Sequence, residues 1–253
     1  MSEALFPWIG SKRKLARHII PLFPRHTCYV EPFCGSAAVF FRKEPSKAEV
    51  LNDVNGELIN LYRVIKHHLD EFVRQLRWAL TSRQMFQWQQ STTPETLTDI
   101  QRAARFFYLQ HLAFGGRCYG QSFGTSATRA RGLNLLRIEE TLSGAHLRLS
   151  SATIEHLDWM ACVERYDRPE TLFYLDPPYW QTTGYAVLFE IGQYLRMADM
   201  ARSVKGRMLI SINDVPDMRQ CFDGLHMKEV SLTYSLNSNT QKARELLVAN
   251  YPI

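Results

Sequence analysis

The 253-residue sequence has no continuous apolar run long enough to cross a membrane, although 45% of its residues are hydrophobic. A transmembrane helix needs about 20 predominantly apolar residues, so we expect no membrane partner. The basic N-terminus is followed only by a short apolar stretch, residues 18–23, which Pro21 interrupts. Because a signal peptide needs a longer apolar core and a small-residue cleavage site, we expect a cytoplasmic protein.

Cysteine is scarce, and its spacing follows no ligand pattern. The five cysteines are Cys28, Cys34, Cys118, Cys162 and Cys221. Their number is odd and no two form a Cys-x-x-Cys pair, which argues against a disulfide framework and a zinc site. The eight histidines show no ligand spacing either. The sequence therefore predicts a reducing compartment and no metal.

Acidic residues are absent between residues 101 and 138, where the chain carries six arginines. The middle of this stretch, residues 114–126, mixes glycine, aromatic and small polar residues. Such side chains contact phosphates and base edges, and the net charge of +5 permits a polyanionic partner. A solvated basic surface loop is the alternative. The candidate DNA-binding residues are Arg117, Tyr119, Gln121, Ser122, Phe123, Arg129 and Arg131.

Short apolar runs alternate with helical patterns along the chain, which predicts an α/β fold with a mainly parallel sheet in one or two domains. The predicted strands are residues 28–33, 48–51, 171–175, 207–212, 229–234 and 245–250, with a strand followed by a loop over 153–159. The last two should form an antiparallel pair. The predicted helices are residues 11–20, 56–80, 94–108 and 190–204, and one opened by the small-residue turn at 34–41.

A nucleotide-binding element is predicted near the N-terminus. A strand leads into the turn around Gly35, and Asp53 follows 18 residues after that glycine. An acid at this distance in doubly wound folds accepts hydrogen bonds from ribose hydroxyls. The turn has one glycine and no G-x-G-x-x-G, so it favours a ligand that contains adenosine but no phosphate. A purely structural strand-turn-helix is the alternative.

The stretch that follows residues 171–175 is Asp176-Pro177-Pro178-Tyr179. The prolines stiffen the chain and restrict Asp176 to extended geometry. The amino group of adenine is a poor nucleophile, and a carboxylate with a proline carbonyl could accept its two hydrogens. The Tyr179 ring offers a stacking surface for an extruded base. These four residues are the predicted catalytic residues, although Asp-Pro-Pro also suits a strand-terminating turn.

Asp158 and Trp159 form a second pairing of an acid with an aromatic ring. Asp158 could accept from an adenine amino group while Trp159 stacks on the ring. A helix N-cap with a packed tryptophan explains the pair equally well.

Four motifs occur in order: Trp8-Ile9-Gly10-Ser11-Lys12, Glu31-Pro32-Phe33-Cys34-Gly35-Ser36, Asn52-Asp53, and Leu157-Asp158-Trp159 before Asp176-Pro177-Pro178-Tyr179. With them the sequence resembles the Dam-like class of DNA adenine methyltransferases of bacteria and phages over essentially its whole length. The resemblance implies a Rossmann-like methyltransferase sheet, S-adenosylmethionine as methyl donor and double-stranded DNA as substrate. It implies a catalytic domain of residues 1–56 and 145–253, with an inserted, mainly helical target-recognition domain of residues 57–144. It also implies a bacterial host cytoplasm and admits a cognate restriction enzyme as partner.

By position, the resemblance assigns cofactor binding to Trp8, Gly10, Lys12, Glu31, Phe33, Gly35, Ser36, Asp53, Asp158, Trp159 and Asp176. Three positions depart from the family pattern: Glu31 replaces a common Asp, Ala37 a common second glycine, and Trp159 a Phe. The predicted reaction is direct in-line transfer of a methyl group to N6 of a flipped-out adenine. DNA cytosine-N4 methylation, RNA adenine methylation and a catalytically silent nucleic-acid-binding relative are the alternatives.

Overall fold

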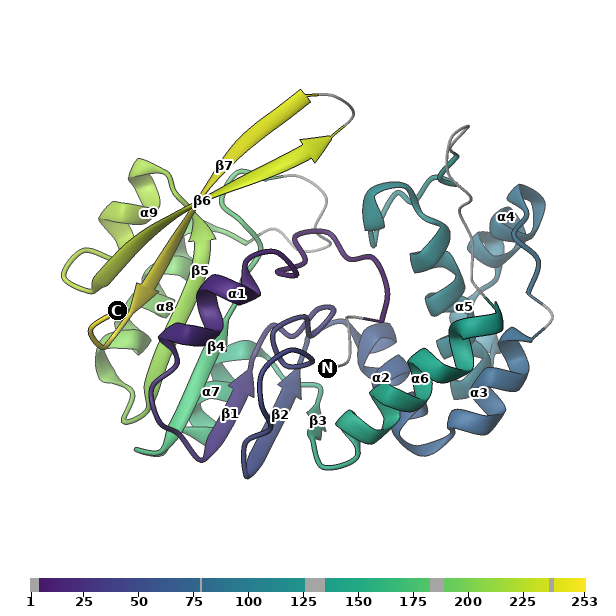
Figure 1. Cartoon of the computed structure of the whole chain (residues 1–253), viewed down its shortest axis with the longest axis horizontal. Helices are drawn as coiled ribbons and strands as arrows, with labels where there is room; N and C mark the ends of the chain where they lie inside the picture. The colour runs from purple at the N-terminus through teal and green to yellow at the C-terminus, as the bar shows by residue number, and fades with distance from the viewer. Residues whose placement is uncertain (1–4, 78, 126–134, 183–188, 237–238) are drawn as a thin grey trace.

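The computed structural model describes residues 5–77, 79–125, 135–182, 189–236 and 239–253. In this part of the chain, seven strands form one sheet in the order β3-β2-β1-β4-β5-β7-β6 (Figure 1). The strands are β1 Cys28–Glu31, β2 Ala48–Asn52, β3 Thr153–Glu155, β4 Thr171–Leu175, β5 Arg207–Asn213, β6 His226–Leu236 and β7 Asn239–Ala249. Strands β1 to β5 run parallel, and β7 is antiparallel to both β5 and β6. The predicted Rossmann-like α/β fold is confirmed.

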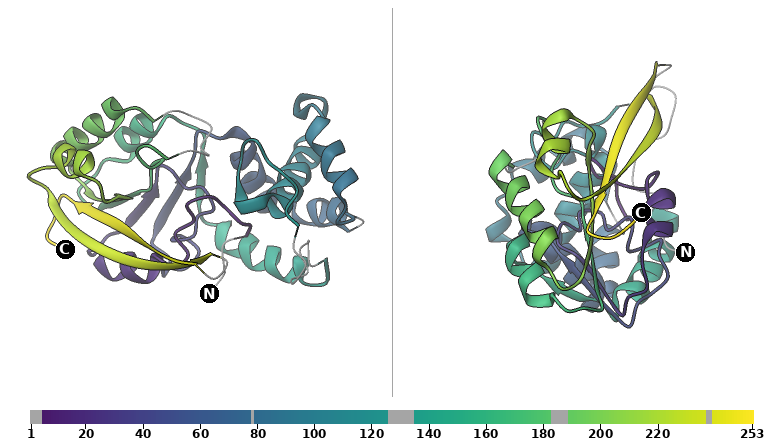
Figure 2. Two further views of the ribbon diagram at one scale, coloured as in Figure 1. Left: turned by 90° about the horizontal axis from the view of Figure 1, so that it is seen from above. Right: turned by 90° about the vertical axis from the view of Figure 1, so that its left-hand side faces the viewer.

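Helices cover both faces of the sheet, as Figure 2 shows. The helices of the described chain are α1 Ala16–Ile19, α2 Gly56–His67, α3 Leu69–Leu76, α4 Arg83–Ser91, α5 Asp99–Leu112, α6 Leu135–Leu149, α7 Trp159–Tyr166, α8 Ile191–Ser203 and α9 Pro216–Cys221. None of the described helices is long and apolar enough to cross a membrane. Helices α7, α8 and α9 pack on one face, and α1, α2, α3, α5 and α6 share a core on the other side, while α4 packs on α5 in a separate small cluster.

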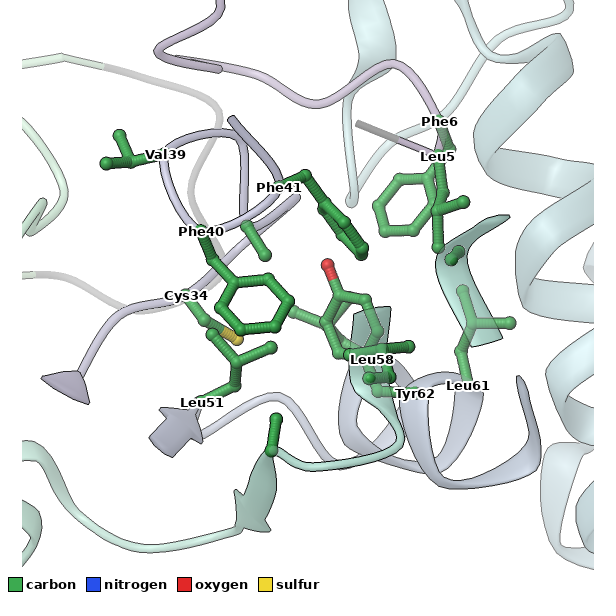
Figure 3. Packing of buried hydrophobic residues seen from close by; sticks show 14 of the residues in the cluster. Leu5, Phe6, Cys34, Val39, Phe40, Phe41, Leu51, Leu58, Leu61 and Tyr62 are labelled. Carbon is green, nitrogen blue, oxygen red and sulfur yellow. The ribbon is translucent and has the colours of Figure 1, made fainter. Parts of the chain in front are cut away.

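Two hydrophobic cores result, one on each face. Successive side chains of a strand point to opposite faces, so Leu172 and Tyr174 of β4 enter one core while Phe173 and Leu175 enter the other. The first core continues from the sheet into helices α2, α3, α5 and α6. Figure 3 shows Leu58 and Tyr62 of α2 beside side chains from the loop and strand at residues 40–51. The helices between β2 and β3 therefore share a core with the sheet.

Two of the helix predictions are wrong: one predicted helix is divided in two, and the other is replaced by turns. The segment predicted as one helix over 56–80 is divided into α2 and α3 at His68, whose backbone leaves the helical region (φ −136°, ψ 41°). The apolar spacing continues across this break, and spacing alone does not report it. The small-residue turn at 34–41 opens no regular helix but a series of turns. There Ala37 has φ 49°, and the Phe40 amide donates to the Glu31 side chain.

The other helix predictions differ mainly at their ends. The helix predicted over 94–108 begins at Asp99, where Thr98 and Gln101 form a capping box, and extends to Leu112. The helix predicted over 11–20 is limited to residues 16–19. The predicted antiparallel pair is confirmed, and each strand is longer than expected. The domain boundaries at 56/57 and 144/145 remain a prediction.

Gly206, immediately before β5, has no room for a side chain. A Cβ there would lie 2.7 Å from the Thr171 carbonyl oxygen and 3.0 Å from that of Arg168, and both are backbone atoms. We therefore expect Gly206→Ala to lower the free energy of unfolding by about 1–3 kcal/mol, as overpacking does. Urea titration followed by circular dichroism measures it. Gly144 is the control, since it is exposed within α6 and a Cβ there meets nothing within 4 Å. Gly144→Ala should stabilise by about 0.5–1 kcal/mol, and equal effects at the two sites would contradict the packing.

Candidate active site

A cavity of about 230 Å³ opens at the carboxyl ends of β1, β2 and β4. This is where open α/β sheets bind ligands, beside the point at which strand order reverses between β1 and β4. The lining includes predicted residues from all four motifs: Trp8, Lys12, Glu31, Phe33, Gly35, Ser36, Asp53, Asp158, Trp159, Asp176 and Pro178. Gly10, Pro177 and Tyr179 do not line it. The fold thus brings together predicted site residues that are up to 170 positions apart in sequence, from Trp8 to Pro178.

Asp53 is fixed at the end of β2 by two backbone amides. Gly35 donates to one carboxylate oxygen at 3.0 Å, and Asn55 donates to the other at 2.9 Å. Burial raises the pKa of the Asp53 carboxyl, while these two hydrogen bonds oppose the shift. A Cβ at Gly35 would lie 2.7 Å from Nε1 of Trp8, and Gly35 has φ 46°. A glycine is therefore required where the tryptophan of the N-terminal loop crosses the turn.

Glu31 is fully buried and lies on the floor of the same cavity. Its Oε1 accepts a hydrogen bond from the Tyr29 hydroxyl at 2.7 Å and from the Phe40 amide at 2.8 Å. Burial raises the pKa of Glu31 to about 8. The carboxyl is therefore mainly neutral at pH 7, and it organises the turn as an acceptor.

Asp176 follows β4 and lies in a connected polar cluster. Lys12 approaches its Oδ1 at 2.8 Å, and the Ser211 hydroxyl of β5 donates to the same atom at 3.0 Å. The Lys12 ammonium also lies 4.4 Å from the centre of the Tyr179 ring. The Tyr179 hydroxyl donates to Glu245 of β7. Burial raises the pKa of Asp176, and the positive charge of Lys12 opposes the shift.

Asp158 and Trp159 adopt the arrangement that the alternative interpretation predicted, a helix N-cap followed by a packed tryptophan. Asp158 is the N-cap of α7 and accepts from the Met160 amide at 2.9 Å. Trp159 is 5% exposed, stacks on Phe33 with 5.9 Å between ring centroids, and donates through Nε1 to Gln193. Both residues still line the cavity. Asp158 and Trp159 therefore combine a structural position with access to a ligand, and their cofactor roles remain predictions.

The segment 113–125, which we call the recognition loop, contains the described part of the predicted DNA-binding set. Arg117, Tyr119 and Ser122 are exposed. Gln121 turns inward to the Arg117 carbonyl and to Gln110, and Phe123 packs 5.6 Å from Phe86. Arg129 and Arg131 lie outside the described residues. The DNA-binding roles remain predictions.

Two of the arginines that make this stretch basic are engaged within the protein. Arg102 pairs with Glu57 of α2, and Arg105 donates to the Gln89 carbonyl. Their charges therefore contribute less to a DNA surface than the sequence count implies.

Several residues of the site were not selected from the sequence. Asn52 is fully buried and joins three strand ends, because its Nδ2 donates to the Pro32 and Leu157 carbonyls and its Oδ1 accepts from the Leu157 amide. A polar residue at the end of an apolar strand could have indicated this role. Ser211 and Glu245 are also buried polar residues on predicted strands. Among the described residues, no group of three or more His, Cys, Asp or Glu side chains could hold a metal ion.

The neutral Glu31 carboxyl predicts a pH dependence of stability. A glutamate with a pKa of 4.5 when unfolded and about 8 when folded binds its proton more tightly in the folded state. This contribution to stability is complete below pH 4.5 and is lost as pH rises toward 8, with a slope of up to about 1.4 kcal/mol per pH unit. Glu31→Gln keeps an acceptor for both hydrogen bonds and should remove the slope.

Unfolding free energies of the wild type and of Glu31→Gln between pH 5.5 and 7.5 test this expectation. The free energy of unfolding of Glu31→Gln minus that of the wild type should increase steadily as pH rises. Glu140→Gln, at an exposed position of α6, is the control and should run parallel to the wild type. A parallel profile for Glu31→Gln as well would mean that Glu31 is ionised in the folded protein.

Comparisons with known proteins agree with this geometry. Residues 8–236 match the family model of the D12 class N6 adenine-specific DNA methyltransferases. The chain is 27% identical to the DNA adenine methylase of Haemophilus influenzae, over 93% of this chain and 88% of that protein. It is 26% identical to the type II methyltransferase M1.LlaDCHI of Lactococcus lactis, over 96% and 94% respectively. It is 24% identical to the type II methyltransferase M.CviBI of Paramecium bursaria Chlorella virus NC1A, over 98% and 100%. The chain belongs to the D12 class of N6 adenine-specific DNA methyltransferases.

Proposed function

We propose that the cavity binds S-adenosylmethionine and that Asp176 activates the amino group of a target adenine beside it. The observation that carries this proposal is that Asp53 and Asp176, from the ends of different strands, line one cavity. When bound, S-adenosylmethionine supplies an electrophilic methyl group on a sulfonium. The side chains present fit such a ligand: Asp53 offers carboxylate oxygens to ribose hydroxyls, and Phe33 and Trp159 offer an apolar wall for the adenine ring.

The corner Asp176–Tyr179 holds the acceptor of the methyl group. The Asp176 carboxylate and the Pro177 carbonyl would accept the two hydrogens of the amino group and direct its lone pair in line toward the bound methyl donor. The carbon–sulfur bond would break as the carbon–nitrogen bond forms, and the proton that the amino nitrogen loses would pass to the Asp176 carboxylate or to water. The Tyr194 hydroxyl donates to the Pro178 carbonyl and thereby fixes the next peptide of the corner. Because one face of the Tyr179 ring is occupied by Lys12, the extruded base stacks on the opposite face. Positioning and electrostatics then supply the rate enhancement.

Double-stranded DNA is the proposed form of the substrate, with the target adenine flipped out at a cost of a few kcal/mol. The recognition loop lies within the proposed target-recognition domain, residues 57–144; its Tyr119 lines the cavity and its Arg117 is exposed to solvent. Two relatives are named type II methyltransferases, so a cognate restriction enzyme is included among the proposed partners. The proposed location is the cytoplasm of a bacterial host.

Substitution of Asp176 by Ala tests the assignment. It removes the carboxylate acceptor, so the transfer rate from tritiated S-adenosylmethionine to duplex DNA should fall by at least about 100-fold. Cofactor affinity should change less than tenfold. Ser211→Ala is the matched control, because it removes one hydrogen bond to Asp176 but leaves the carboxylate, and it should lose less than tenfold in rate. Folded Asp176→Ala protein with near-normal turnover would refute the proposed role.

The same assay distinguishes the alternative substrates. Duplex DNA, single-stranded DNA and RNA are offered separately, and the labelled base is identified after hydrolysis. Label in N6-methyladenine of duplex DNA supports the proposal. Label in N4-methylcytosine or in RNA would replace it with an alternative substrate, and cofactor binding without any transfer would indicate a silent binding protein.

A further inference from the structure

Gln110, on the last turn of α5, is a fully buried polar side chain that joins two loops. Its Nε2 donates to the Pro7 carbonyl at 2.8 Å and to the Gly116 carbonyl at 2.6 Å. Its Oε1 accepts from Nε2 of Gln121 at 3.2 Å. Pro7 belongs to the N-terminal segment 7–12, here called the cofactor loop, whereas the other two partners belong to the recognition loop.

The backbones of the two loops also touch directly. The Ile9 amide donates to the Gly116 carbonyl at 3.1 Å, so this carbonyl receives donors from both the loop and Gln110. A Cβ at Gly116 would lie 3.0 Å from the Pro7 carbonyl carbon and 3.0 Å from the Trp8 amide nitrogen, and Gly116 has φ 65°. Only glycine allows this approach without strain.

Each loop contributes side chains to the cavity. The cofactor loop supplies Trp8, Ile9 and Lys12, and the recognition loop supplies Cys118 and Tyr119. The recognition loop also exposes Arg117 and Ser122 to solvent. One short segment thus lines the cavity and also presents exposed side chains, and it is held against the cofactor loop by Gln110 together with the Ile9–Gly116 hydrogen bond.

We propose that Gln110 is a positioning residue that clasps the recognition loop to the cofactor loop, so that a ligand in the cavity and a DNA duplex each strengthen the binding of the other. The inference rests on the proposed function for the identity of the two ligands. A ligand in the cavity contacts both loops and fixes them together, so that DNA meets a recognition loop already held in place. Thermodynamic linkage then requires the reverse effect to be equal.

A purely structural role for Gln110 would lower stability and activity without altering this coupling. The measured quantity is therefore the ratio of two dissociation constants for S-adenosylhomocysteine, an unreactive stand-in for the cofactor, in the absence and presence of saturating linear plasmid DNA. Isothermal titration calorimetry on the full chain gives both constants. For the wild type we expect DNA to tighten binding by about fivefold or more.

In Gln110→Leu the apolar volume is kept while all three hydrogen bonds are lost, and the ratio should fall below about two. Gln90→Leu is the matched control, since Gln90 donates to the Gln121 carbonyl from the exposed side and, within the described part of the chain, forms no hydrogen bond to the cofactor loop. This variant should keep the wild-type ratio within twofold. If Gln110→Leu does not fold by circular dichroism, Gly116→Ala replaces it, because its Cβ separates the same two backbones.

A ratio near one in the wild-type protein would refute the clasp. So would a ratio in folded Gln110→Leu, or in Gly116→Ala used in its place, that equals that of the wild-type protein. An equal fall of the ratio in Gln90→Leu would also refute it. Failure of the proposed function looks different. Absence of methyl uptake into any DNA by the wild type, with the coupling intact, would overturn the proposed reaction and leave the clasp standing. Methyl uptake into DNA without coupling would support the proposed reaction and refute the clasp.

Discussion

The positive charge of Lys12 is the element on which the electrostatics of the site depend. Glu31, Asp53, Asp176 and Glu245 are desolvated near one edge of the sheet, and burial raises the pKa of each. A buried carboxylate stays ionised only with a counter-charge or hydrogen-bond donors. Lys12, itself 5% exposed, supplies that charge to Asp176 and also favours the ionised form of Glu245. The N-terminal segment is thus part of the polar cluster around Asp176.

The other two carboxyls are accommodated without a close cation. Asp53 accepts hydrogen bonds from two backbone amides, and the neutral form of Glu31 accepts hydrogen bonds from a hydroxyl and a backbone amide. Three different solutions to desolvation therefore operate around one cavity: a cation beside Asp176, backbone amides at Asp53 and protonation at Glu31. Such differences are needed where several acids lie close together, because a neighbouring carboxylate raises the pKa of a carboxyl and favours its protonation.

The strands and the carboxylates at their ends could be predicted from the sequence, because both depend on residues that are close together in the chain. An apolar run followed by Asp176-Pro177-Pro178 must leave the sheet at that point. Long-range contacts follow no such rule. Ser211 reaches Asp176 across 35 residues and Glu245 reaches Tyr179 across 66, and nothing near either residue in sequence reports its partner.

Composition likewise counts charges without their partners. Arg102 and Arg105 belong to the basic stretch in sequence, yet Arg102 pairs with Glu57, and Arg105 donates to a backbone carbonyl. Helix breaks escape prediction for a related reason. The apolar spacing of residues 58–76 records which side chains are buried, and two successive helices satisfy it as well as one.

The core that the helices α2, α3, α5 and α6 share with the sheet limits how a new sequence preference could arise. Transplanting the whole helical segment from a relative would set foreign side chains against Phe40, Phe41 and Leu51 and leave gaps or overlaps there. Replacing a few solvent-facing residues between Ala113 and Thr125 carries no such penalty. On the proposed role of the recognition loop, a changed sequence preference is therefore expected from substitutions at its solvent-facing positions, and hybrids made by exchanging the whole helical segment should often be insoluble.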